Sequence, residues 1–132
     1  MPPKILSGLT IVVVEDHDDV RSVLAQFLRQ QGARVIACSN AYEALEAVVQ
    51  ERPDLVLSDI SLPDEDGFQL LQNVRSLGPE MGSNTPVIAM SALGATITNH
   101  RALAAGFCSY LGKPFTPQQL LYAIQEALRL QN

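Results

Sequence analysis

Side chains that could take part in metal or phosphoryl chemistry stand at the ends of short apolar runs in this sequence. Four of these runs lead into such residues, namely Glu15 and Asp16, Asp59, Ser91, and Lys113. Carboxylates gathered in one place repel one another and require a cation, and a ligand set made only of oxygen suits Mg²⁺. A hydroxyl and an ammonium beside them could hold the remaining oxygens of a phosphoryl group. The residue types therefore indicate magnesium-assisted phosphoryl chemistry, provided that the fold brings these residues together.

Each of these residues also has an ordinary structural interpretation. Asp16 could begin a helix, and Asp59 could begin a turn. Ser91 could cap a turn, and Lys113 could be a solvated surface lysine. A chance set of such residues at four strand ends is improbable, so we interpret them together as one site.

The apolar runs themselves are predicted strands. They are short and lack polar alternation, which is typical of strands buried on both faces of a parallel sheet. With one further run, the five predicted strands cover residues 11–14, 34–38, 54–59, 86–90 and 108–111.

Amphipathic segments separate these runs and predict helices. The first has the apolar spacing Val20, Val23, Leu24, Phe27 and Leu28, with a cap at Asp18 or Asp19 and a stop at Gly32. The others are predicted over 41–51 after a cap at Ser39 or Asn40, over 68–77, up to Ala105, and from Pro117 after a cap at Thr116. Strands alternating with helices predict an α/β fold with a doubly wound, five-stranded parallel sheet. Ligands bind beyond the carboxyl ends of the strands in such sheets, which is where the candidate residues stand.

The composition limits the class of protein. A chain of 132 residues with 47% hydrophobic and 17% charged residues forms one folded domain and is not intrinsically disordered. A net charge of −5 argues against binding to nucleic acid or to an anionic membrane, and no apolar run is long enough to span a bilayer. The N-terminus lacks the pattern of a signal peptide, and the two cysteines fit no zinc motif. We therefore expect a cytoplasmic protein.

Several short motifs follow one another along the chain in a recognisable order. They are Glu15-Asp16, Asp59 followed by Pro63 and Asp66-Gly67, Ser91-Ala92, Tyr110, and Lys113-Pro114. Together they resemble the receiver domain of two-component response regulators. The resemblance implies a flavodoxin-like receiver fold with the strand order 2-1-3-4-5. It places the receiver domain at residues 9–130, after an N-terminal extension of residues 1–8.

The resemblance also implies a role for each matching residue. Asp59 would be the nucleophile that takes a phosphoryl group from a phosphohistidine on a histidine kinase or a histidine phosphotransfer protein. Asp16 and Asp59 would bind Mg²⁺ directly, with the backbone carbonyl of Ser61 as a third protein ligand and Glu15 acting through water.

Other matching positions would hold and sense the phosphoryl group. Lys113 would balance its charge and Ser91 would donate a hydrogen bond, with further donation from the backbone N–H groups of Ile60 and Ala92. Ser91 and Tyr110 would be the switch residues, because the added charge can draw Ser91 inward and let Tyr110 move. The Lys113-Pro114 peptide bond would be cis.

The implied function is a phosphorylation-dependent signalling switch rather than an enzyme, with Mg²⁺-dependent self-phosphorylation and slow autodephosphorylation. Its expected partners are the phosphodonor protein and an unidentified downstream protein. The segments 6–9 and 58–67 resemble receivers fused behind sensor histidine kinases. The chain is therefore expected to be a stand-alone regulator or the receiver of a hybrid kinase. Ser61 and Leu93 occupy positions that modulate dephosphorylation in this family.

Other functions fit the sequence less well. A magnesium-dependent phosphatase or phosphotransferase with an aspartyl nucleophile would need a general acid that Ser61 cannot provide. A flavin-binding domain of similar topology would need a phosphate-cradling loop where Glu15 and Asp16 repel phosphate. A degenerate receiver that only binds partners would not retain every chemical position. His17, beside the acidic pair, is expected to be a solvated loop histidine.

The cysteines offer a test of the strand order. In the usual receiver order, Cys38 and Cys108 lie on opposite edge strands, about 19 Å apart at the usual strand spacing. This is too far for a disulfide, so we expect two free thiols, in keeping with a reducing cytosol.

Overall fold

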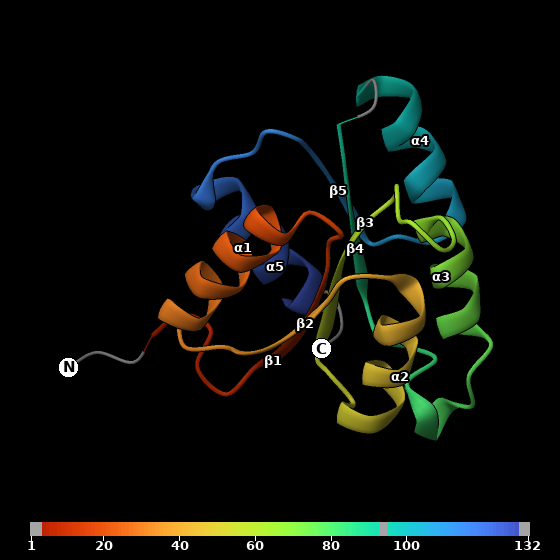
Figure 1. Cartoon of the computed structure of the whole chain (residues 1–132), viewed down its shortest axis with the longest axis horizontal. Helices are drawn as coiled ribbons and strands as arrows, with labels where there is room; N and C mark the ends of the chain where they lie inside the picture. Colours follow the sequence, from red (N-terminus) through yellow and green to blue (C-terminus); the bar gives the residue numbers. More distant parts are fainter. Residues whose placement is uncertain (1–3, 93–94, 130–132) are drawn as a thin grey trace.

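The structure of this chain is a computed structural model that describes residues 4–92 and 95–129. Leu93 and Leu130, the last residue of the predicted domain, lie outside the described residues. Five parallel strands form one sheet in the order β2-β1-β3-β4-β5 (Figure 1). The strands are β1 Thr10–Val14, β2 Arg34–Cys38, β3 Leu55–Asp59, β4 Val87–Ser91 and β5 Ser109–Gly112. The predicted order 2-1-3-4-5 is therefore confirmed, and the strand order reverses between β1 and β3.

Helices cover both faces of the sheet. They are α1 Asp18–Gln30, α2 Ala41–Glu51, α3 Gly67–Arg75, α4 Ala95–Ala105 and α5 Pro117–Arg129, with a short 3₁₀ helix, η1, at Pro79–Met81. Figure 1 shows α1 and α5 on one face and α2, α3 and α4 on the other. The doubly wound α/β prediction is confirmed. The chain positions its candidate residues through the loops that connect strand ends to these helices.

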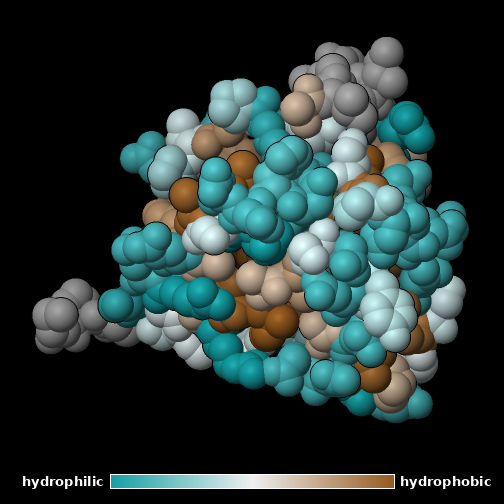
Figure 2. Space-filling view, in the orientation of Figure 1, coloured by the Kyte–Doolittle hydropathy of each residue, from teal (hydrophilic) through white to brown (hydrophobic). Residues whose placement is uncertain are grey.

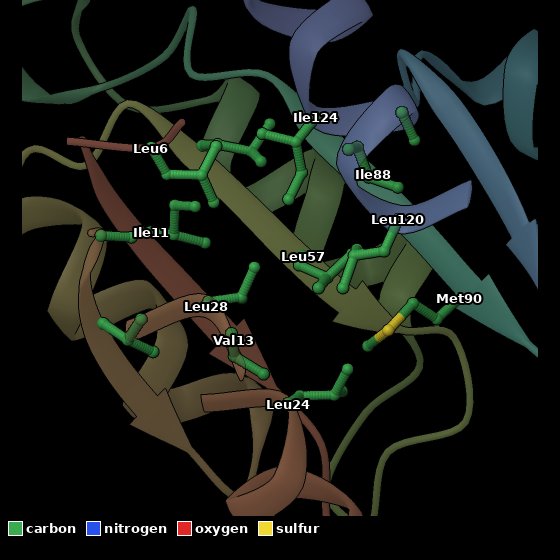
Figure 3. Packing of buried hydrophobic residues seen from close by; sticks show 14 of the residues in the cluster. Leu6, Ile11, Val13, Leu24, Leu28, Leu57, Ile88, Met90, Leu120 and Ile124 are labelled. Carbon is green, nitrogen blue, oxygen red and sulfur yellow. The ribbon is translucent and has the colours of Figure 1, made fainter. Parts of the chain in front are cut away.

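Burial of β1 on both faces explains why its sequence is a β-branched run without polar alternation. Ile11 and Val13 pack into the core beneath α1 and α5, whereas Val12 and Val14 pack into the core beneath α2, α3 and α4. All four are fully buried. Figure 3 shows part of the first core, in which Leu28 of α1 and Ile124 of α5 lie over the strands. Both faces of the central strands are therefore apolar, as parallel sheets require.

The segment predicted as an N-terminal extension contributes to this core. Leu6 is 1% exposed and lies in the cluster beneath α1 and α5 (Figure 3). Its backbone N–H donates to the carbonyl of Gln31, 2.8 Å away, at the end of α1. The described part of the extension is thus packed against the domain.

Helix α1 departs from its predicted cap and apolar stripe. Its N-cap is His17, with no side-chain cap hydrogen bond, and Asp18 and Asp19 lie in the first turn instead. Acidic residues in the first turn interact favourably with the positive end of the helix dipole. Val20 and Val23 are 42% and 66% exposed, so two of the five predicted apolar positions face solvent rather than the core.

Most of the other predicted elements agree with the structure to within two residues at each end. Helix α2 and strand β2 have the predicted bounds, and Asn40 is the N-cap of α2. Cys38 and Cys108 are both free, as predicted. In the described ranges, no helix combines the length and apolarity that a membrane crossing requires. The surface in Figure 2 is largely hydrophilic, with apolar residues showing mainly in its middle.

Candidate functional site

The carboxyl ends of β1, β3 and β5 bring one ammonium between two carboxylates. Nζ of Lys113 lies 2.6 Å from Oε1 of Glu15 and 2.7 Å from Oδ2 of Asp59. The registers that pair Val14 with Ser58 and Asp59 with Met90 align these strand ends. The three residues, distant in the sequence, therefore form one ionic network at the strand-order reversal.

Burial makes this network electrostatically strained. The side chain of Glu15 is fully buried, and those of Asp59 and Lys113 are 7% and 22% exposed. Burial alone would raise the pKa of Glu15, but hydrogen bonds from Lys113 and from His17 lower it to about 2. For Asp59, burial raises the pKa above its ordinary value despite Lys113 and the Ser61 N–H, and the charge of Glu15 raises it further. Asp59 is thus the carboxylate whose charge is harder to maintain.

Asp16 supplies a third carboxylate with an unused oxygen. Its Oδ1 is buried and, among the described residues, is the one buried side-chain polar atom with no hydrogen-bond partner. Nδ1 of His17 is 3.4 Å from this oxygen and 3.1 Å from Oε2 of Glu15. A buried carboxylate oxygen that accepts no hydrogen bond is a natural ligand for a hard cation.

The loop after β3 packs closely against Asp59. Oδ1 of Asp59 accepts a hydrogen bond from the Ser61 N–H at 3.0 Å, and the Gly67 N–H donates to the Ile60 carbonyl at 2.7 Å. A Cβ added at Gly67 would lie 2.8 Å from the Asp59 carbonyl oxygen, so only glycine allows this close approach. Both oxygens of Asp59 therefore already accept hydrogen bonds, one from Lys113 and one from the loop.

Ser91 and Tyr110 lie at the ends of β4 and β5. Ser91 is buried and is the last residue of β4. It directly follows Met90, which pairs with Asp59 of β3. The Tyr110 hydroxyl donates to the Ser91 carbonyl at 3.4 Å, so the aromatic side chain already reaches the end of β4. Ala92 is exposed directly after Ser91, and the Lys113–Pro114 peptide bond is cis.

Comparison with known proteins agrees with this arrangement. Residues 11–125 match the model of the response regulator receiver domain. This chain belongs to the response regulator receiver domain family. A phosphorylation-dependent switch is the general function of such a domain, which is a signalling domain and not a classical enzyme.

Two relatives and one solved structure place this receiver domain among similar proteins. It is 38% identical to an uncharacterized 14.6 kDa protein from the sodA1 3′ region of Leptolyngbya boryana, over 92% of this chain and 91% of that protein. It is 33% identical to the transcriptional regulatory protein GltR of Pseudomonas aeruginosa, over 93% of this chain but only 50% of GltR. The BeF3-activated receiver domain of RstA from Klebsiella pneumoniae has a TM-score of 0.81 and 30% identity, covering 91% of this chain and 98% of that one. The receiver domain thus spans about half the length of GltR.

Receiver domains normally bind Mg²⁺ at an acidic pocket, and the residues of this chain fit such an ion. Glu15, Asp16 and His17 offer ligand atoms within 4.8 Å of one another. Oδ1 of Asp16, which is buried and accepts no hydrogen bond within the described part of the chain, is the atom that a cation would satisfy. Oxygen ligands suit Mg²⁺ better than the imidazole of His17 does.

The sequence-predicted residues gather unevenly at this receiver site. Glu15, Asp59 and Lys113 are in direct contact, and Asp16 and Ser61 adjoin them along the chain. The histidine at position 17 is 72% exposed, as expected for a solvated residue, but it also hydrogen-bonds Glu15, which the sequence analysis missed. That contact is local, and the position of a histidine two residues after a buried acid was the only sequence signal for it.

Proposed function

We propose that this receiver domain takes a phosphoryl group onto Asp59 from a phosphohistidine on a histidine kinase or histidine phosphotransfer protein. The observation that carries the proposal is the contact of Lys113 with both Asp59 and Glu15, next to an Asp16 oxygen that is buried and accepts no hydrogen bond from the described residues. Such an arrangement offers a carboxylate nucleophile, a counter-charge and a cation ligand at one place. In the transfer, an oxygen of Asp59 bonds to phosphorus while the bond from phosphorus to the donor histidine nitrogen breaks.

Four groups would hold a magnesium ion in this proposal. Asp16 and Asp59 would bind it directly, the carbonyl of Ser61 would be a third ligand, and Glu15 would act through water. When bound, the ion supplies a Lewis acid that neutralises charge on the phosphoryl oxygens.

Lys113, Ser91 and two backbone groups would hold the phosphoryl oxygens. The Lys113 ammonium already lies 2.7 Å from Oδ2 of Asp59, so it would need only a small shift to follow the phosphoryl group. Ser91 lies at the end of the strand next to Asp59. Its hydroxyl and the N–H groups of Ile60 and Ala92 are the proposed hydrogen-bond donors to the remaining oxygens.

Tyr110 would carry the change to the outer surface. Its hydroxyl already donates to the Ser91 carbonyl, so a shift of Ser91 toward a phosphoryl group would change the position of the ring. The surface formed by α4, β5 and α5 would then differ between the two states, and an unidentified downstream protein would recognise the difference. Phosphorylation supplies the driving charge, close to −2 near neutral pH.

The phosphodonor protein would dock beside the site on α1. A largely apolar hollow of about 450 Å³ opens there, lined by Val20, Leu24, Ala92, Lys113, Pro114 and Phe115. Val20 and Val23 are exposed on the same helix although they are apolar. Because Lys113 lines both the hollow and the ionic network, an apolar partner surface seated here would reach Asp59.

Labelling with acetyl phosphate and Mg²⁺ tests this function. We expect the intact mass of the protein to rise by one phosphoryl group, with the label on Asp59 and little sustained turnover. Asp59→Asn should abolish the label. Asp54→Asn, a matched change just before the start of β3, should keep it. Label that persists on Asp59→Asn would contradict the assignment, as would its absence from the wild-type protein.

A further inference from the structure

The acceptor loop between β3 and α3 is tied to α2, which packs beside α3 on the same face of the sheet. Oδ1 of Asp64 accepts a hydrogen bond from the Ala41 N–H, and Oδ2 accepts one from the Tyr42 N–H, each at 3.0 Å. These partners are 23 and 22 positions earlier in the sequence. In Figure 1 the loop after β3 lies beside the first turn of α2. One carboxylate thus joins the loop that follows Asp59, the proposed phosphoacceptor, to the start of α2.

This contact completes the capping of α2. The first N–H groups of a helix have no partner within it, and here the first intrahelical bond runs from the Ala44 N–H to the Asn40 carbonyl. The side chain of Asn40 accepts only from the Glu43 N–H, at 2.9 Å. Asp64 accepts hydrogen bonds from the two remaining N–H groups, those of Ala41 and Tyr42. Its negative charge lies at the positive end of the helix dipole. The carboxylate is therefore held by directed bonds and by charge.

The same carboxylate constrains the residues beside Asp59. Ser61 is three residues before Asp64, and Pro63 between them limits the conformations of the backbone. The Ser61 N–H donates to Oδ1 of Asp59, so any movement of the loop at Asp64 would displace a direct partner of the acceptor. The far end of the loop is fixed separately, because the Gly67 N–H donates to the Ile60 carbonyl.

We propose that Asp64 is a positioning residue for phosphoryl transfer, acting by clamping the acceptor loop to the first turn of α2. This rests on the proposed function of Asp59. With the clamp in place, the Ser61 N–H and carbonyl keep their positions relative to Asp59. Without it, the loop would still close at Gly67, but Ser61 would no longer be held toward the site.

Asn40 provides the matched control. Asn40→Ala removes a cap from the same helix turn but leaves the acceptor loop untouched, whereas Asp64→Ala removes both the cap and the clamp. A role limited to helix capping therefore predicts the same behaviour for the two variants, with loss of melting temperature and fraying of α2 and nothing more. Asp64→Asn keeps one acceptor oxygen and tests partial rescue in a variant of nearly unchanged shape.

Amide hydrogen exchange is the deciding measurement, because it requires neither Mg²⁺ nor a phosphodonor. We expect the Ser61 amide of Asp64→Ala to exchange about tenfold faster than in the wild type, with Asp64→Asn in between and Asn40→Ala unchanged. The Mg²⁺ affinity and the rate of labelling by acetyl phosphate should fall about tenfold in Asp64→Ala and stay within about twofold in Asn40→Ala.

Equal Ser61 exchange in Asp64→Ala and Asn40→Ala would overturn the proposal. So would wild-type Mg²⁺ affinity in an Asp64→Ala protein whose Tyr42 amide has lost its protection. A wild-type protein that takes no label would refute the proposed function of Asp59, but the exchange comparison at Ser61 would still decide whether Asp64 clamps the loop.

Discussion

Oε1 of Glu15 lies 2.6 Å from Nζ of Lys113, although 98 positions separate the two residues in the sequence. The same ammonium lies 2.7 Å from Asp59, so one cation balances two carboxylates at the edge of the sheet. Glu15 is fully buried and cannot be solvated if Lys113 is removed. The stability of the metal-free site therefore depends strongly on this lysine, which contacts both carboxylates.

Lys113→Met should lower the free energy of unfolding by about 2 kcal/mol, because it leaves two carboxylates without their cation. The cost is below that of a fully buried pair because Lys113 is 22% exposed. Lys4→Met, a change of the same kind at an exposed position, should have almost no effect. Urea unfolding followed by circular dichroism measures the free energy of unfolding of both variants and of the wild type.

The double variant Lys113→Met/Glu15→Gln should regain part of the lost stability, since the uncompensated buried charge is then gone. If Lys113→Met unfolds at the same urea concentration as the wild type, or if the double variant shows no recovery, the ionic network does not carry the stability assigned to it.

The pKa of Asp59 should depend on Glu15. Burial raises this pKa above its ordinary value of 3.8, and the charge of Glu15 raises it further. Glu15→Gln removes that charge and leaves Lys113 to Asp59 alone, so the pKa should fall. A carbon-13 NMR titration of the Asp59 carboxyl measures the change, with Glu46→Gln on the exposed face of α2 as the control.

The raised pKa of Asp59 also makes the stability of the protein depend on pH, and the sign of this dependence follows by linkage. An acid whose folded-state pKa is raised costs stability while it is charged, and this cost disappears as the pH falls through the folded-state value. Protonated Asp59 is also a poor nucleophile, so the rate of labelling should fall over the same pH range. An Asp59 pKa that is unchanged or higher in Glu15→Gln would show that the two carboxylates do not interact in the predicted way.

The strand ends could be predicted from the sequence because parallel strands bring their carboxyl ends to one edge whatever the details of the loops. Glu15, Asp59 and Lys113 therefore meet as the sequence analysis implied. The orientation of α1 was less accessible, because apolar spacing does not say which residues of a stripe the core has room for. Leu24 and Leu28 are buried, whereas Val23 faces solvent.

Long-range contacts of single side chains could not be predicted from the sequence. Asp64 lies in a polar loop where a solvated side chain is the usual outcome, and nothing in residues 60–66 identifies the first turn of α2 as its partner. The resemblance implied that Glu15 acts through water on a metal, but the structure adds its salt bridge to Lys113. Such contacts depend on how loops from different strands pack, which local pattern does not encode.

Asp16→Asn should separate the metal site from ordinary helix structure. The wild type should gain about 1.4 kcal/mol of stability at a Mg²⁺ concentration ten times the dissociation constant, because the unfolded chain has no such site. Asp16→Asn should be slightly more stable than the wild type without metal, since it removes a charge close to the buried Glu15, and it should lose most of the Mg²⁺ effect. Asp19→Asn, in the exposed first turn of α1, should keep that effect.

Thermal melts in EDTA and in millimolar Mg²⁺ measure these changes for all three proteins. A wild type that melts at one temperature in both buffers would contradict the magnesium site. Equal Mg²⁺ stabilisation of the wild type and Asp16→Asn would show that the buried Oδ1 of Asp16 is not a ligand.

Val23→Lys should slow phosphoryl transfer from a protein donor without affecting transfer from a small one. Val23 is 66% exposed on α1, so lysine at this position leaves the core intact and stability should change by less than about 0.5 kcal/mol. A charge on the exposed apolar side of α1, the helix whose Val20 and Leu24 line the hollow at Lys113, would slow transfer from a protein that carries phosphohistidine by about tenfold. Acetyl phosphate needs no such surface, so it should label Val23→Lys as fast as it labels the wild type.

Tyr42→Lys, on the opposite face of the sheet and 68% exposed, is the matched control for both donors. If Val23→Lys slows both donors equally, α1 contributes to the chemistry of the site rather than to docking, and if it slows neither, the phosphodonor protein binds elsewhere.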